Sequence, residues 1–385
     1  MECIENRKTM KIKLLSEPQP IRSSGVRAVD IVEHAHPPAP RNPRPIVIIG
    51  AGGIVHDAHL PAYRKAGFPV VSLVDPDSSK AKALAQQFDV PFATESIGEA
   101  VLFASKDRIF DIAVPASALL RVLPLLPDGA AVLLQKPMGE TLEEAEAILA
   151  LCRNKGLVAA VNFQLRWAPA MLGASALRQA GVLGTLHDME VQVNVHQPWE
   201  LWQFLSTAPR LEILYHSIHY IDLVRAWLGN PERVYAKTVR SPRTPHLAAT
   251  KSVIVLDYGD WTRAYIATNH SHDFTKGLQR SYVQWEGTEA AVHAQMGVNL
   301  NYPVGEPDSL GYVTHGSELQ WLPVRGNWFP DAFMGSMGSL QTFVDGASEH
   351  LPTSVEDAIH TMRVVEAAYL SSERGGEALP GPPSQ

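Results

Sequence analysis

Lys136 stands where an amine could accept a proton. It follows five apolar residues, 130–134, and precedes Pro137, so its side chain cannot point into bulk water as easily as a lysine on a helix surface. Apolar surroundings or a neighbouring positive charge lower the pKa of an amine. An amine with a lowered pKa can serve as a general base toward a hydroxyl group. The simpler alternative is a surface lysine that closes the edge of a sheet.

Three further side chains that can exchange protons share one predicted helix, 212–228. Tyr215, His219 and Asp222 occupy positions i, i+4 and i+7, which places them on one stripe of an α-helix, with His216 at its edge. A histidine held by a carboxylate is suited to relaying protons, so we expect Asp222 to hold the imidazole of His219. The alternative is a core histidine whose hydrogen bonds are satisfied by Asp222.

A glycine-rich turn joins two short apolar runs, 46–49 and 70–74, whose composition is typical of buried parallel strands. The first glycine, Gly50, would make the tight turn, and Gly52 would let the backbone approach a pyrophosphate at the start of the next helix. Asp75 follows Gly50 by about 25 residues, near the offset at which a carboxylate binds the ribose of a dinucleotide. This order predicts a dinucleotide site.

The same carboxylate favours NAD over NADP. The charge of Asp75 would repel a 2′-phosphate, and the next residues, Pro76 and Asp77, include no arginine to bind one. The sixth position of the glycine pattern is Val55 rather than Gly or Ala, so the helix and the strand are expected to lie slightly further apart. An ordinary strand–turn–helix unit is the alternative, but strand, turn, helix, second strand and terminal Asp together favour the cofactor site.

The segments from 45 to 165 alternate as a doubly wound parallel sheet requires, which predicts an N-terminal Rossmann domain. The sequence predicts helices at 78–88 and 141–156 and strands at 110–114, 130–134 and 157–162. Ligands of such sheets bind beyond the carboxyl ends of the strands. The residues expected at those ends are Gly52, Asp75, Pro115, Lys136 and Asn162.

The second half predicts a different architecture, a C-terminal α/β domain over 166–350 with a large, mostly antiparallel open sheet. Strand-like runs follow the helix at 212–228, and they cover 234–239, 251–258, 261–267, 281–285 and 290–296. The last segment, 351–385, begins with a helix-capping pattern at Ser354. We expect its long helix to pack back on the first domain.

Bulk composition excludes several classes of protein. The chain has 385 residues, a net charge of −7 and no basic run, so nucleic acid is not expected as a partner. Two cysteines far apart indicate a reducing compartment, and the absence of a long apolar stretch argues against a membrane span, so a cytoplasmic protein is expected. Residues 1–44 are rich in proline, which predicts a mobile leader without regular elements; an arm that wraps a neighbouring subunit is the alternative.

Several of these motifs together resemble the Gfo/Idh/MocA oxidoreductases. They are the glycine turn with Gly53 and Ile54, the run 59–62 that begins with His59, Asp75, Lys136–Pro137, the run 162–166, the run from His219 to Asp222, and the run 353–358. The resemblance implies a Rossmann domain, a bound nicotinamide cofactor, sugar-like or cyclitol substrates, and homodimers or homotetramers joined through the open sheet. It also implies that Lys136 contacts both cofactor and substrate.

The resemblance assigns a role to each candidate residue. The cofactor would contact Gly50, Gly52, Gly53, Ile54, Asp75, Val114, Pro115, Lys136 and Asn162; the substrate would contact Lys136, Arg166, His216 and His219; catalysis would involve Lys136, His219, Tyr215 and Asp222. Two acidic residues common in the family are replaced by Gln135 and Tyr215. The proton-handling network is therefore expected to differ, with Tyr215 and His216 as partial substitutes, and so is the substrate.

The sequence as a whole predicts an NAD-dependent oxidoreductase that acts on a carbohydrate-like alcohol or its ketone. One alternative is an enzyme that cleaves glycosidic bonds by transient redox chemistry, and another is an NAD-binding sensor without turnover. His216 with His219, and His270 with His272, invite a metal site. No compact set with established ligand spacing completes the shell, so no metal is expected.

Overall fold

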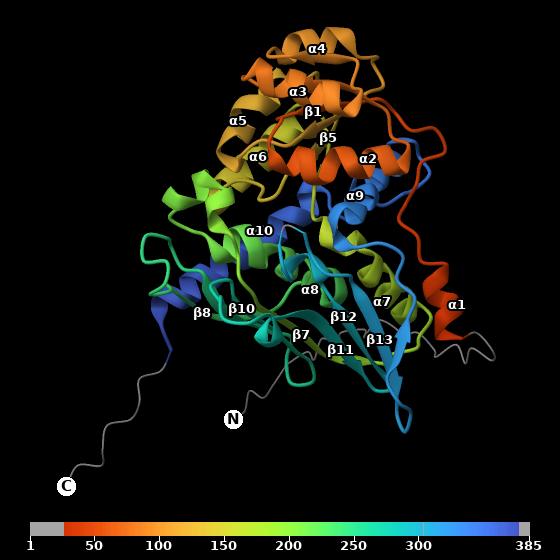
Figure 1. Cartoon of the computed structure of the whole chain (residues 1–385), viewed down its shortest axis with the longest axis vertical. Coiled ribbons are helices and arrows are strands. Elements are labelled where there is room, and N and C mark those ends of the chain that lie inside the picture. The colour runs from red at the N-terminus through yellow and green to blue at the C-terminus, as the bar shows by residue number, and fades with distance from the viewer. Residues whose placement is uncertain (1–26, 303, 377–385) are drawn as a thin grey trace, which may run out of the picture.

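The computed structural model describes residues 27–302 and 304–376, and they build two sheets. Figure 1 shows the smaller sheet with its helices above the larger one. The smaller sheet is parallel and has the strand order β3-β2-β1-β4-β5-β6. Its strands are β1 (Ile46–Ile49), β2 (Val70–Val74), β3 (Phe92–Thr94), β4 (Ile109–Ile112), β5 (Ala131–Leu134) and β6 (Val158–Val161). The predicted Rossmann sheet is confirmed.

Helices cover both faces of this sheet, and its central strands are therefore buried on both sides. They are α2 (Leu60–Ala66), α3 (Ser78–Phe88), α4 (Ile97–Phe103), α5 (Leu119–Val122) and α6 (Leu142–Asn154). Side-chain caps fix three of the starts: Asp77 accepts a hydrogen bond from the N–H of Ser79, Ser96 accepts one from Glu99, and Thr141 accepts one from Glu144. A π-helical segment, η1 (Val55–His59), leads from the glycine turn into α2.

The larger sheet has eight strands in the order β14-β13-β12-β11-β7-β10-β9-β8. Only the β7–β10 pair is parallel, so the predicted, mostly antiparallel sheet is confirmed. The strands are β7 (Leu186–Asn194), β8 (Arg233–Val239), β9 (Lys251–Asp257), β10 (Arg263–Asn269), β11 (Arg280–Gly287), β12 (Ala290–Gln295), β13 (Ser309–Thr314) and β14 (Gln320–Leu322). The sequence analysis missed β7, β13 and β14. In β7, polar residues alternate with buried apolar ones, because one face of the strand is covered and the other is not.

The remaining α-helices are α1 (Ala28–Glu33), α7 (Pro169–Gln179), α8 (Ile218–Leu228), α9 (Trp328–Val344) and α10 (Val355–Arg374). Helices α7 and α8 lie against one face of the large sheet. Helix α10 contacts α6 and β6 of the smaller sheet and also α8 and β8 (Figure 1). Among the helices of the described residues, none is both long and apolar enough to cross a membrane.

The described part of the proline-rich extension, residues 27–44, packs against the rest of the chain. Helix α1 contacts α7, and the backbone N–H of Arg44 donates to Gln341 of α9 at 2.8 Å. The side chain of Arg44 forms an ion pair with Asp345 at 2.7 Å. The expectation that the leader holds no regular element is therefore wrong for this part, because apolar residues of α1 such as Val32 find a packing surface. Residues 1–26, which carry the rest of that prediction, lie outside the described residues.

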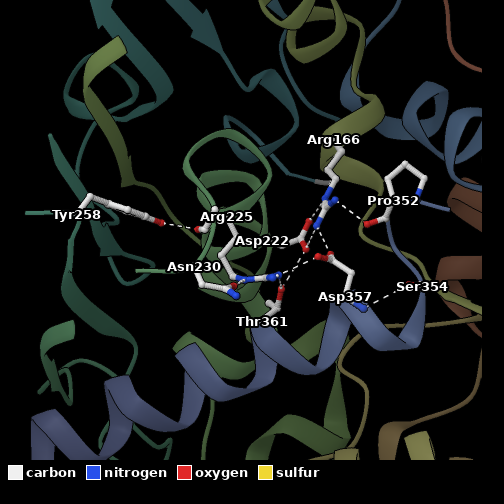
Figure 2. A network of polar contacts seen from close by, with 10 residues as sticks. Arg166, Asp222, Arg225, Asn230, Tyr258, Pro352, Ser354, Asp357 and Thr361 are labelled. Atoms are coloured by element: carbon white, nitrogen blue, oxygen red, sulfur yellow. Dashed lines mark hydrogen bonds and ion pairs between the residues drawn. The ribbon is translucent and has the colours of Figure 1, made fainter. Parts of the chain in front are cut away.

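A buried polar network connects the end of the parallel sheet to α8 and α10 (Figure 2). Arg166, just after β6, donates two hydrogen bonds of 2.6 Å to the carboxylate of Asp222 on α8. It also donates to Asp357 on α10 at 2.8 Å and to the carbonyl of Pro352 at 2.9 Å. Arg225 completes the network by donating to Asp357 at 3.2 Å. We call Arg166, Asp222, Arg225 and Asp357 the arginine clamp.

Two predicted site residues are thus occupied elsewhere. The guanidinium of Arg166 points into the clamp and donates there to Asp222, Asp357 and the carbonyl of Pro352, and its assignment as a substrate-binding residue stays a prediction. Burial alone would lower the pKa of Arg166, but the charges of Asp222 and Asp357 raise it above its usual value. The carboxylate of Asp222 accepts from Arg166 and from Thr361. It therefore does not hold the imidazole of His219, as the sequence had suggested.

Breaking the clamp should destabilise the whole fold. Arg166→Met leaves the carboxylate of Asp222, which is 1% exposed, without its cation. We expect a loss of about 3–5 kcal/mol in the free energy of unfolding, measured by urea denaturation. The double variant Arg166→Met with Asp222→Leu should recover part of this loss, because no buried charge remains unpaired.

Arg153→Met is the matched control. Arg153 also pairs with an acidic residue of α10, Glu356, but the two side chains are 61% and 51% exposed. Its removal should lower the free energy of unfolding by less than about 1 kcal/mol. Equal losses in the two single variants would contradict a structural role for the clamp.

Candidate functional site

The lysine after β5 is held at the boundary between the two sheets. The peptide bond between Lys136 and Pro137 is cis. The ammonium of Lys136 donates a hydrogen bond of 2.9 Å to the backbone carbonyl of Tyr215, which precedes α8. Burial lowers the pKa of Lys136 to about 8. About a tenth of this amine is thus unprotonated at pH 7, where an unperturbed lysine is almost entirely charged, and only this neutral form can act as a general base.

His219 lies in the first turn of α8 and is 7% exposed. Its ring packs edge-on against the indole of Trp328, with 5.6 Å between the ring centroids. Burial and the neighbouring charge of Lys136 lower the pKa of His219 well below its usual value. Its Nδ1 atom has no hydrogen-bond partner among the described residues. The imidazole is therefore neutral and has a ring nitrogen available to a polar ligand.

The prediction that Tyr215 and His219 lie on one stripe of an α-helix is wrong. Residues 213–217 form a π-helical segment, η7 (Ile213–Ser217), and α8 begins only at Ile218. The wider turn of a π-helix removes the i, i+4 alignment of an α-helix. The hydroxyl of Tyr215 instead donates to Glu140 at 3.1 Å. Burial and Glu140 raise the pKa of this tyrosine, so it stays protonated and reaches Lys136 only through its backbone carbonyl.

A second histidine pair extends away from the lysine. The ring of His216 lies 4.6 Å from that of His270 and 4.9 Å from that of Trp199, between centroids. Burial, His270, Lys136 and His219 all lower the pKa of His216. Trp199 and His270 also line a pocket of about 240 Å³. Within the described residues, no group of three or more His, Cys, Asp or Glu side chains could hold a metal ion.

The glycine turn has the shape that a dinucleotide needs. Gly50 adopts a φ of +110°, and a Cβ there would lie 2.3 Å from the carbonyl oxygen of Ala113, so only glycine fits. A Cβ at Gly52 would meet no atom within 4 Å, and one at Gly53 would meet only the Asp57 carboxylate at 3.9 Å. The backbone of this turn is therefore open to a close approach, and Ile54 follows at the start of the helical segment.

The other residues predicted for the cofactor surround this turn. One oxygen of Asp75 accepts from the backbone N–H of Ala51 at 2.9 Å, which brings the carboxylate beside the glycines. Val114 and Pro115 follow β4, next to Ala113. Asn162 follows β6, is fully buried, and has no partner for either polar atom of its amide among the described residues. An open glycine cradle, an adjacent carboxylate and an unpaired buried amide fit a bound dinucleotide.

The sequence analysis overlooked two acidic residues beside these groups. Glu140, four residues after Lys136, accepts the hydrogen bond of Tyr215. Asp111 lies within the apolar run of β4 and is fully buried. A carboxylate within such a run breaks the pattern of a buried strand, which is the signal that could have drawn attention to it.

Comparison with known proteins agrees with this geometry. Residues 44–163 match a family model described as "Oxidoreductase family, NAD-binding Rossmann fold". Residues 179–378 match a second model, "Oxidoreductase family, C-terminal alpha/beta domain". Among curated proteins, D-apiose dehydrogenase of Paraburkholderia graminis is 24% identical over 339 residues, covering 85% of this chain and 87% of the relative. D-glucoside 3-dehydrogenase of Escherichia coli is 24% identical over 355 residues, covering 87% and 97%.

Solved structures share the fold. An oxidoreductase from Agrobacterium radiobacter, solved with NAD+, L-tartaric acid and magnesium, superposes with a TM-score of 0.71 at 18% identity, covering 87% of this chain and 98% of the other. Aldose-aldose oxidoreductase from Caulobacter crescentus, solved with glycerol, superposes with a TM-score of 0.71 at 17% identity, covering 87% and 99%. Because both family models match and together span most of the chain, it belongs to the Gfo/Idh/MocA family of oxidoreductases and has their NAD-binding Rossmann domain.

Proposed function

We propose that this oxidoreductase transfers a hydride between NAD and a carbohydrate-like alcohol or its ketone. The observation that carries the proposal is the buried amine of Lys136, whose pKa of about 8 and hydrogen bond to the Tyr215 carbonyl prepare it for proton transfer. The curated relatives support the substrate class, since they include proteins named D-apiose dehydrogenase, scyllo-inositol 2-dehydrogenase and D-glucoside 3-dehydrogenase.

The residues of this chain divide the work by position. The glycine turn, Asp75 and Asn162 would hold NAD, which when bound accepts or donates the hydride. The Nζ atom of Lys136 takes the proton of the substrate hydroxyl in the direction of oxidation, while the Tyr215 carbonyl keeps that amine in place. The neutral imidazole of His219 orients the same hydroxyl by a hydrogen bond, and Trp328 beside it keeps water away.

Substitution of the lysine tests this role. Lys136→Met should still bind NAD but lose at least about a hundredfold in turnover, the lower range for general acid–base catalysis. In the native protein, the oxidation rate should rise with pH up to about 8, because the ammonium form cannot accept a proton. The measurement is NADH accumulation with a panel of sugars and cyclitols. Net accumulation also separates this function from transient redox, which returns its hydride in each cycle.

A measurement of the free energy of unfolding checks that the lysine variant is folded. The pKa of Lys136 is about 8 in the folded state and 10.5 when unperturbed, so burying the ammonium below pH 8 costs about 3 kcal/mol. Lys136→Met removes this penalty and should be at least as stable as the native protein at pH 7, by urea denaturation. Its advantage should shrink as pH rises from 8 to 10.5. Lys82→Met, on the exposed side of α3, is the control and should change neither turnover nor the free energy of unfolding. Full activity in Lys136→Met would remove the lysine from the mechanism.

Cofactor preference tests the role of the carboxylate beside the glycine turn. If Asp75 binds the ribose diol, NAD should bind more tightly than NADP, and Asp75→Ala should narrow that difference. Titration calorimetry with both cofactors measures it directly. Asp77→Ala is the control, because Asp77 caps α3 two residues further along. Equal affinity of the native protein for the two cofactors would contradict the assignment.

We also propose that the outer face of the large sheet joins copies of this chain. This face opposes the one covered by α7 and α8, and it exposes apolar side chains on β8 and β9: Tyr235, Val253 and Val255 are 52%, 50% and 38% exposed. Exposed apolar patches of this kind favour association.

Sedimentation should show that the native protein forms an oligomer. The double variant Val253→Asp with Val255→Asp should dissociate it. Leu102→Asp on α4, where the native side chain is 87% exposed, should leave it unchanged, and a stable native monomer would contradict the proposal.

A further inference from the structure

A fully buried carboxylate lies behind the lysine corner, within the parallel sheet. The Oδ2 atom of Asp111 accepts a hydrogen bond of 2.7 Å from the hydroxyl of Tyr63 on α2. The same oxygen lies 2.6 Å from Nδ1 of His59, the last residue of η1. Asp111, Tyr63 and His59 are all 0% exposed, and the ring of Phe333 on α9 covers the histidine at 4.9 Å between centroids. An ionised group is costly at such a position and requires a specific arrangement of partners.

This arrangement continues to the backbone of Lys136. The Nε2 atom of His59 lies 3.2 Å from the amide nitrogen of Gln135, and the amide oxygen of Gln135 accepts a hydrogen bond of 2.9 Å from the backbone N–H of Lys136. Asp111, His59, Gln135 and Lys136 therefore form one continuous chain of hydrogen bonds, which we call the corner chain. It links the middle of β4 to the residue proposed as general base.

The chemistry of each partner fixes the direction of every hydrogen bond. The N–H of Lys136 can only donate, so Gln135 must present its oxygen there and its NH2 group to His59. The Nε2 atom of His59 must then accept, which leaves the ring proton on Nδ1. A proton on Nδ1 needs an acceptor, and Asp111 supplies one. The neutral Nδ1–H tautomer of His59 is thus the form that gives each hydrogen bond of the corner chain one donor and one acceptor.

A glutamate at position 135 would not fit this chain. Its carboxylate could accept from Lys136 but could not donate to His59, so the ring would have to carry a proton on both nitrogens between two buried carboxylates. We propose that Asp111, acting through His59 and Gln135, is the positioning residue for the Lys136–Pro137 corner, and that the buried carboxylate on β4 is what requires an amide at position 135. The functional part of this inference rests on the proposed role of Lys136.

The surface of the same protein holds an exposed counterpart. Nδ1 of His56 lies 2.5 Å from the carboxylate of Asp57, and its Nε2 lies 3.0 Å from the amide nitrogen of Gln87. The chemical order of carboxylate, imidazole and amide is that of the corner chain, but His56 and Asp57 are 46% and 52% exposed. Water can solvate a charge at this second place, which makes Gln87→Glu a matched control for Gln135→Glu.

A cycle of variants tests whether Asp111 and Gln135 act together. Gln135→Glu should lower the unfolding temperature and weaken NAD binding by about tenfold or more, because a second carboxylate faces His59 in a buried site. Asp111→Asn alone should also be less stable than the native protein. Together, Asp111→Asn and Gln135→Glu restore a single carboxylate and reverse both hydrogen bonds of the His59 ring: the new amide on β4 donates to Nδ1, and Nε2–H donates to the new carboxylate at position 135. The backbone N–H of Lys136 still donates to position 135, and the hydroxyl of Tyr63 accepts from the new amide instead of donating to the carboxylate. This double variant should bind NAD within about threefold of the native protein.

Nitrogen-15 NMR of histidine-labelled protein shows which ring nitrogens of His59 carry a proton. A merely structural role of Asp111 and Gln135 would not change this protonation pattern. The resonances of His59 are assigned by their loss in His59→Asn. We expect the Nδ1–H tautomer in the native protein, a doubly protonated ring in Gln135→Glu at pH 7, and the Nε2–H tautomer in the double variant. Gln87→Glu should leave the His59 signals, the unfolding temperature and NAD binding unchanged.

Two results would overturn the inference. One is an Nε2–H tautomer of His59 in the native protein, and the other is a double variant no more stable and no better at binding NAD than Gln135→Glu. Failure of the native protein to bind NAD at all would instead contradict the cofactor assignment, while the tautomers and unfolding temperatures would still decide the corner chain. The two failures are therefore distinguishable.

Discussion

The bidentate ion pair between Arg166 and Asp222 is the constraint on which the relative placement of the two sheets depends. Arg166 follows the last strand of the parallel sheet, and Asp222 lies on the helix that begins with the residues around His219. Because a bidentate pair fixes both distance and orientation, it sets where α8 lies relative to the carboxyl ends of the parallel strands. The hydrogen bond from Lys136 to the Tyr215 carbonyl crosses the same boundary and depends on that placement.

Burial acts on the clamp and on the candidate site in opposite ways. In the clamp, each buried charge has a partner of opposite sign, so Arg166 remains charged. At the site, burial lowers the pKa values of Lys136, His216 and His219, and the charge of Lys136 lowers those of the two histidines further. The clamp thus keeps its charges and fixes the geometry, whereas burial at the site makes Lys136 easier to deprotonate and keeps His216 and His219 neutral.

Local sequence patterns were sufficient to predict the parts of the candidate site that lie directly after strands of the parallel sheet. The turn at Gly50, the carboxylate of Asp75 and the corner at Lys136 all follow short apolar strands, whose ends can be recognised from the sequence. The partner of Asp222 could not be recognised, since Arg166 is 56 residues away and meets it only in the folded chain. The π-helical turn before α8 was also beyond prediction, because the periodicity of an α-helix was assumed throughout.

The corner chain shows why the role of Gln135 can be misjudged from sequence alone. Gln135 by itself looks like the loss of a carboxylate and hence of proton-handling capacity. In the folded protein, the neighbouring strand β4 provides a carboxylate at Asp111, and the parallel pairing of β4 with β5 brings it within reach of the same histidine. Since His59 has two ring nitrogens, a negative charge on one side requires a donor on the other, and an amide at position 135 provides that donor. An amide at position 135 is therefore the partner that the buried pair of Asp111 and His59 requires.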